Sequence, residues 1–142
     1  VYFYNMIQRV QSLLLVVVIL CGVCLFLFPF AKYEGYPLLF LRNPIDITPI
    51  PNYLSVITAL LALFMYSNRK LQIKLCYFII VFNITLLLAI FFLTNQLYDH
   101  DFEKKTFLFS TYLPFVAIIM AFMASRYIKK DEELVRSADR IR

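Results

Sequence analysis

The longest apolar stretch of the chain constrains its fold more than any other feature. Residues 13–30 contain no charged or strongly polar side chain. Together with residues 7–12, this stretch exceeds the roughly 20 residues that cross a bilayer core as a helix. Across the chain, 62% of the residues are hydrophobic, whereas a soluble domain averages about half or less. Lipid is the obvious cover for this excess. We therefore predict an integral membrane protein.

A cleavable signal peptide is the alternative interpretation of this first stretch, with Arg9 as its positively charged start. The apolar region is too long for a signal peptide, and residues 28–31 lack the small side chains that signal peptidase requires. We therefore expect a transmembrane helix that ends at Pro29.

Three further apolar stretches predict three more helices, so we expect an all-α bundle of four transmembrane helices. The four spans are expected at residues 7–30, 50–67, 75–96 and 107–125. In this scheme residues 1–125 form the transmembrane domain, and residues 126–142 continue the fourth helix into the cytoplasm. The second span is the shortest, and we expect Asn52 to cap its start. The proline-rich segment 31–52 is expected to be an external loop, because its prolines disfavour regular structure in hydrocarbon.

Basic residues are distributed unequally between the two predicted sides of the membrane. If both termini are inside, ten Lys and Arg residues are cytoplasmic and four are external. The excess of positive charge on cytoplasmic loops therefore places both termini in the cytoplasm. Because this orientation explains the net charge of +5, we expect no nucleic-acid partner.

Small residues recur at helical spacing on two of the predicted spans. Such residues let helix backbones approach closely in lipid, where the hydrophobic effect does not drive association. We therefore expect them to face neighbouring helices. The two stripes are Ser55, Ala59 and Ala62 on the second span, and Ala117, Ala121 and Ala124 on the fourth.

Few residues suggest a catalytic, redox or metal-binding role. Cys21 and Cys24 form a CxxC pair, but no nearby charge would lower a thiol pKa, so we favour a packing role. His100 stands alone among acidic residues in a short polar link, and a metal site needs three or four ligands. Asn83 and Thr85 are expected to hydrogen-bond across helices or back to the carbonyl four residues earlier. We predict no catalytic, metal or cofactor site.

No Asp, Glu, Lys, Arg or His falls within the central part of any predicted span. Ion-coupled transporters place such residues there, so coupled transport is disfavoured.

The last seventeen residues, 126–142, form the strongest candidate for a functional segment. The pairs Glu132–Arg136 and Lys129–Glu133 have the spacing that supports a helix, and Leu134 begins a narrow apolar stripe suited to docking another helix or a protein groove. The residues expected to bind a protein partner are Asp131, Glu132, Glu133, Leu134, Arg136, Ser137, Asp139 and Arg140. Arg126, Lys129 and Lys130 lie where the helix leaves the membrane and complement anionic lipid headgroups.

Three stretches, at residues 6–11, 68–76 and 129–142, resemble the domain-of-unknown-function family DUF4293. The resemblance implies a small four-helix inner-membrane protein of Bacteroidota bacteria without an assigned activity. By the predicted topology, all three stretches lie on the cytoplasmic side. We therefore expect a platform of Gln8, Arg9, Arg69 and Lys70 to contact Asp131, Glu132 or Glu133 and so fix the angle at which the tail leaves the membrane.

These observations favour a noncatalytic accessory subunit or adaptor of the bacterial inner membrane, which docks a protein partner through its C-terminal helix. Membrane lipids, including those with anionic headgroups, are the other expected partners. The alternative is a small lipid- or solute-handling protein with a cavity among its helices. A thiol–quinone oxidoreductase is a more distant third.

Overall fold

A computed structural model describes residues 2–28, 31–33, 36–39, 49–96, 105–107 and 109–139, with side chains described at 10–28, 49–92 and 109–137. Four α-helices account for most of these residues. They are α1 (Tyr2–Leu27), α2 (Pro49–Phe64), α3 (Arg69–Gln96) and α4 (Leu113–Asp139).

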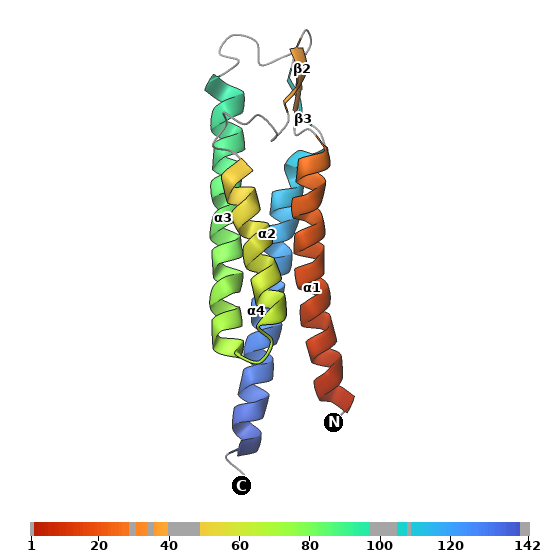
Figure 1. Ribbon diagram of the computed structural model, residues 1–142, viewed down its shortest axis with the longest axis vertical. Helices are drawn as coiled ribbons and strands as arrows, with labels where there is room; N and C mark the ends of the chain where they lie inside the picture. Colours follow the sequence, from red (N-terminus) through yellow and green to blue (C-terminus); the bar gives the residue numbers. More distant parts are fainter. Residues whose placement is uncertain are drawn as a thin grey trace.

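The helices form an up-down-up-down bundle (Figure 1). α1 packs chiefly against α2 and α4, and α3 packs against the same two helices. The start of α1, the turn between α2 and α3, and the end of α4 therefore lie at one end of the bundle (Figure 1). We call this the terminal end.

Three short strands lie at the opposite end (Figure 1), within the connections between the helices. They are β1 (Ala31–Tyr33), β2 (Tyr36–Leu39) and β3 (Lys105–Phe107), paired antiparallel in the order β2-β1-β3. The segment expected as an external loop thus contains two paired strands, which the sequence pattern did not indicate. Pro37 does not prevent pairing because β2 is an edge strand, where a missing N–H group is tolerated. The sheet joins the α1–α2 connection to the α3–α4 connection.

α3 begins six residues earlier than expected, at Arg69 instead of residue 75. Asn68 explains this start, because its Oδ1 accepts a hydrogen bond from the backbone N–H of Leu71 at 3.4 Å, as an N-cap residue does. Its carbonyl also accepts the helical bond from the N–H of Gln72 at 3.0 Å. Residues that were expected in a loop, including Arg69 and Lys70, therefore lie on the first turn of a helix.

α2 is much shorter than the other helices. Its 16 residues extend about 24 Å at 1.5 Å each, short of a hydrocarbon core of roughly 30 Å. Three helices, α1, α3 and α4, are long and apolar enough to cross a membrane, whereas α2 is a shorter apolar helix. Pro49 and Pro51 lie in its first turn, where their missing N–H groups leave no unpaired donor.

α4 continues without a break from Leu113 to Asp139. It follows a short 3-10 turn, Phe109–Tyr112. Pro114 is the second residue of the helix, where proline fits without distortion. We call residues 126–139 the stem; the last part of α4 extends beyond the end of α2 at the terminal end of the bundle (Figure 1).

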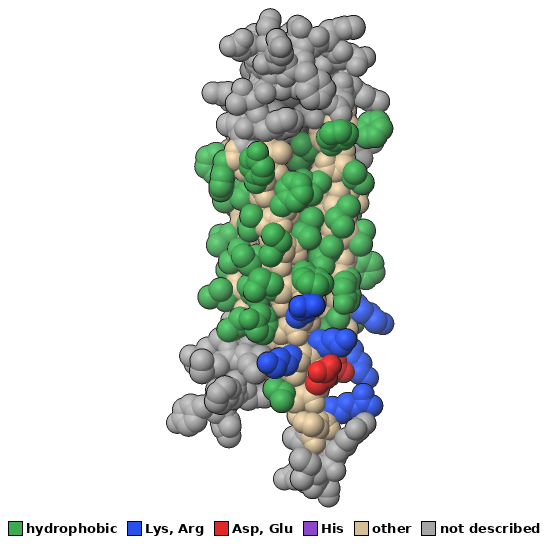
Figure 2. All heavy atoms as spheres, turned by 180° about the vertical axis from the view of Figure 1, so that it is seen from behind, with side chains coloured by type: hydrophobic (Ala, Val, Ile, Leu, Met, Phe, Trp, Pro, Cys, Tyr) green, Lys and Arg blue, Asp and Glu red, His purple; other side chains and the backbone are tan. Residues whose placement is uncertain are grey.

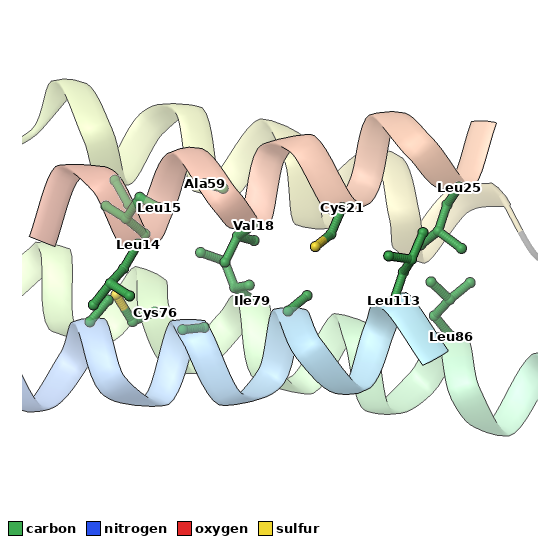
Figure 3. Packing of buried hydrophobic residues seen from close by; sticks show 14 of the residues in the cluster. Leu14, Leu15, Val18, Cys21, Leu25, Ala59, Cys76, Ile79, Leu86 and Leu113 are labelled. Carbon is green, nitrogen blue, oxygen red and sulfur yellow. The ribbon is translucent and has the colours of Figure 1, made fainter. Parts of the chain in front are cut away.

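The interior of the bundle is built from branched aliphatic and small side chains. Leu15, Val18 and Leu25 of α1 meet Ile79 and Leu86 of α3 within it (Figure 3). All six residues of the predicted small-residue stripes are buried, namely Ser55, Ala59, Ala62, Ala117, Ala121 and Ala124. The outer surface carries a broad belt of hydrophobic side chains (Figure 2), as suits a lipid-facing surface.

Candidate functional site at the base of the stem

Asp131 lies on the buried face of α4, although it is charged. Asp131 continues the buried stripe of α4, in which Ala124 is followed by Ile128 and then by Asp131 at spacings of four and three residues. The face of α4 that packs inside the bundle therefore carries straight on into the stem. The side chain of Asp131 is only 2% exposed, so its carboxylate needs a partner within the protein.

Arg69, on the first turn of α3, is that partner. Its Nε lies 3.4 Å from Asp131 Oδ2, and its Nη1 donates a hydrogen bond to the backbone carbonyl of Asp131 at 3.4 Å. The Nε–Oδ2 distance exceeds the roughly 2.7–2.9 Å of a charge-assisted hydrogen bond. Consistent with this, neither carboxylate oxygen has a hydrogen-bond partner among the described residues. The contact is therefore an ion pair combined with a side-chain to backbone hydrogen bond.

The two residues differ in how far they are removed from water. The Arg69 side chain is 17% exposed, against 2% for Asp131. A buried charge that loses its partner is strongly destabilised, whereas a charge with a path to water is not. Asp131 therefore depends on Arg69 more than Arg69 depends on Asp131.

Two more buried polar side chains join neighbouring helices. Asn52 Nδ2 donates to the carbonyl of Gly22 at 3.1 Å and links α2 to α1. Gln72 Nε2 donates to the carbonyl of Ala62 at 3.0 Å and links α3 to α2. Asn52 was expected to cap α2, and this expectation is wrong, because the helix begins three residues earlier, at Pro49.

The predicted roles of Asn83 and Thr85 are confirmed. Asn83 Nδ2 donates both to Ser55 Oγ at 2.7 Å, across the α2–α3 interface, and to the carbonyl of Ile79 at 2.8 Å. Thr85 Oγ1 donates to the carbonyl of Val81, four residues earlier, at 3.0 Å. Asn83 thus links α3 to α2, whereas the exposed Thr85 satisfies its hydroxyl group within its own helix.

Gly22 has a structural role that the sequence reasoning missed. A Cβ atom at this position would overlap Cγ2 of Val56 on α2. The absence of a side chain therefore allows α1 and α2 to approach closely, and the same approach brings Asn52 within reach of the Gly22 carbonyl. The signal was present, since Gly22 is one of only two glycines and lies within an apolar span.

Most of the predicted partner-binding residues are accessible. Glu133, Leu134, Arg136 and Ser137 are exposed and Glu132 is half-buried, whereas Asp131 is buried. Neither Glu132–Arg136 nor Lys129–Glu133 forms an ion pair within the described part of the chain. The side chain of Asp139 and all of Arg140 lie outside the described residues.

The predicted platform is described only in part. Arg69 contacts Asp131 as above, while Lys70, the next residue along α3, is exposed. The side chains of Gln8 and Arg9 lie outside the described set, although their backbone belongs to α1.

The three cysteines are free thiols. Cys21 and Cys76 are buried and Cys24 is half-buried. Among the described residues, no group of three or more His, Cys, Asp or Glu side chains is placed to hold a metal ion. His100 and the acidic residues beside it lie outside the described residues.

The fold and the contacts define a class of protein: an apolar helical bundle of membrane-spanning dimensions, with a charged helical stem at its terminal end. A family model described as "Domain of unknown function (DUF4293)" matches residues 7–141. The chain therefore belongs to the DUF4293 family, as its sequence motifs indicated. Neither a curated protein nor a solved structure matches the chain.

Proposed function

We propose that the protein is a noncatalytic accessory subunit or adaptor of the bacterial inner membrane, which docks a protein partner through its stem. In this proposal both termini face the cytoplasm, and the terminal end of the bundle is the end that meets the partner. The observation that carries the proposal is the contact between Arg69 and Asp131, because it fixes the base of the stem to α3.

A stem held in this way is suited to docking. An isolated helix of about this length is marginally stable in water, so tertiary contacts decide whether it forms. A docking helix that is already formed and oriented loses less conformational entropy when it binds. The Arg69–Asp131 contact supplies that orientation.

Leu134 is the best placed anchor for a partner. It is 50% exposed on the stem, with Glu133 and Arg136 exposed nearby. An apolar side chain surrounded by charged residues resembles the centre and rim of a protein interface. The acidic and basic neighbours would then select the partner by charge.

The other functions considered from the sequence gain no specific support. The amide side chains of Asn52, Gln72 and Asn83 hydrogen-bond between helices, which is a packing role instead of a solute site. The thiols of Cys21 and Cys24 are not joined in a disulfide.

Photocrosslinking in native membranes tests the docking proposal. A photoreactive residue at Leu134 is expected to give one discrete protein adduct. The same residue at Leu20, which is 56% exposed on the hydrophobic belt, is the matched control and is expected to react with lipid. Adding Arg69→Gln should reduce the Leu134 adduct at least several-fold. The proposal fails if Leu134 gives no protein adduct, or if Leu20 gives the same one.

A further inference from the structure

Basic side chains gather just beyond the hydrophobic belt at the terminal end of the bundle (Figure 2). Five of them are exposed, and they come from two neighbouring helices. We call this set the collar: Lys70 and Lys74 of α3, with Arg126, Lys129 and Lys130 of α4.

The collar occupies a narrow band along the bundle axis. The Arg69–Asp131 contact sets the two antiparallel helices at the same height, and each residue then adds about 1.5 Å. Lys70 and Lys130 lie about 1.5 Å from that contact toward the belt, while Lys74 and Arg126 lie about 7.5 Å from it. The resulting band is about 6 Å high, close to the roughly 5–7.5 Å thickness of the headgroup layer of one leaflet.

The exposed acidic side chains border this band on the side away from the belt, where Figure 2 shows them beside Lys and Arg side chains. Glu132 and Glu133 follow Asp131 along α4 and lie on the side away from the belt, and Asp131 itself is buried against Arg69. Within the band, the described residues contribute no exposed Asp or Glu.

Aromatic residues mark the same boundary. Tyr66, in the turn before α3, is 69% exposed, and Tyr127 of the stem is 37% exposed. Tyrosine is enriched at the level of lipid headgroups. The guanidinium carbon of Arg126 lies 5.0 Å from the centre of the Phe122 ring, so Arg126 leans back toward the belt. The belt edge at the collar therefore has the composition of a membrane interface.

We propose that the collar binds anionic phospholipid headgroups and selects them over zwitterionic ones. A Lys or Arg near an anionic leaflet attracts it appreciably, and the attraction falls off within a Debye length. This proposal does not depend on a protein partner for the stem, because the stem residues Leu134 and Arg136 lie outside the collar.

Lipid selectivity in reconstituted bilayers tests the proposal. The association of spin-labelled phosphatidylglycerol is compared with that of spin-labelled phosphatidylcholine by electron paramagnetic resonance. For the wild type we expect a preference of about fivefold for phosphatidylglycerol, as one cation contact would give. In Lys74→Gln/Arg126→Gln, which removes the two collar cations nearest the belt, the preference should fall clearly below that of the wild type, while the three remaining cations retain part of it. Circular dichroism checks that each variant is folded, and the two single variants are measured alongside.

The matched control removes the same charge outside the collar, in Arg136→Gln/Arg140→Gln, and should retain the preference of the wild type. An equal loss in this control would show that net charge acts at a distance, which overturns the proposal. An absence of preference in the wild type would overturn it as well. Displacement of the lipid by inorganic phosphate would identify a free anion as the ligand instead of a headgroup.

Discussion

Asp131 of α4 and Arg69 of α3 form an ion pair at the base of the stem, and the two side chains are buried to different degrees. The aspartate is 2% exposed and the arginine 17%. Their contact joins the helix that emerges as the stem to the first turn of its neighbour. It thereby connects the packing of the bundle to the direction in which the stem leaves it.

The difference in burial predicts unequal effects of removing each partner. Arg69→Gln leaves a buried carboxylate without its counter-charge, and we expect a loss of about 2–4 kcal/mol in the free energy of unfolding. Asp131→Asn leaves an arginine that can reach water, and we expect about 1 kcal/mol. Unfolding in mixed micelles of mild detergent and dodecyl sulfate measures both values. Equal losses would show that the burial of Asp131 is not the source of the effect.

The close approach of α1 and α2 at Gly22 predicts a second effect. Gly22→Ala should destabilise the bundle by about 1–3 kcal/mol, because the new methyl group overlaps Val56 and the branched valine side chain has little rotameric freedom. Val56→Ala in the same chain should recover most of that loss, with Val56→Ala alone as the control. A Gly22→Ala protein as stable as the wild type would contradict the close approach.

The hydrogen bond between Asn83 and Ser55 predicts a measurable coupling. A double-mutant cycle with Asn83→Ala and Ser55→Ala should give a coupling energy of about 0.6 kcal/mol, and at most about 1.7 kcal/mol, as for other bonds between membrane helices. Thr85→Val is the control, because Thr85 bonds only within its own helix, and its coupling to Ser55 should be near zero. A coupling near zero between Asn83 and Ser55 would mean that their hydrogen bond does not contribute to stability and that the bond of Asn83 to the Ile79 carbonyl satisfies its amide group.

Much of the architecture could be predicted from the sequence. The apolar stretches gave the four helices, because each lacks charge and strong helix breakers over most of its length. The spacing of Ala117, Ala121 and Ala124 also indicated the buried face of α4. The helix ends were less predictable, because Asn68 and Pro49 act through local capping geometry that hydrophobicity does not reveal.

The candidate site was predictable only in outline. The sequence placed Arg69 and three consecutive acidic residues at the same end of the bundle, but helix phase decides which of the three faces α3. Extending the alanine spacing through Ile128 would have selected Asp131. The small sheet could not be foreseen in this way. Its strands pair two connections that are far apart in the chain, and each strand is too short to show an alternating apolar pattern.

The proposed orientation, with both termini in the cytoplasm, predicts which side of the membrane exposes the stem. Ser137→Cys, at an exposed stem position, should react with a membrane-impermeant maleimide in inverted vesicles and not in intact cells. Tyr112, in the 3-10 turn just before α4 at the opposite end of the bundle, is 59% exposed, and Tyr112→Cys should show the reverse pattern. Labelling of Ser137→Cys in intact cells would place the stem outside the cytoplasm and would contradict the docking proposal.

Hydrogen exchange in the stem tests the central claim most directly, namely that Arg69 holds the stem in place through Asp131. In Arg69→Gln, the amide groups of residues 131–139 should exchange about tenfold faster than in the wild type, equivalent to about 1.4 kcal/mol of local stability. In Lys70→Gln, which removes the same charge from the adjacent exposed position, exchange should match that of the wild type. Unchanged exchange in Arg69→Gln, or an equal rise in both variants, would contradict the claim.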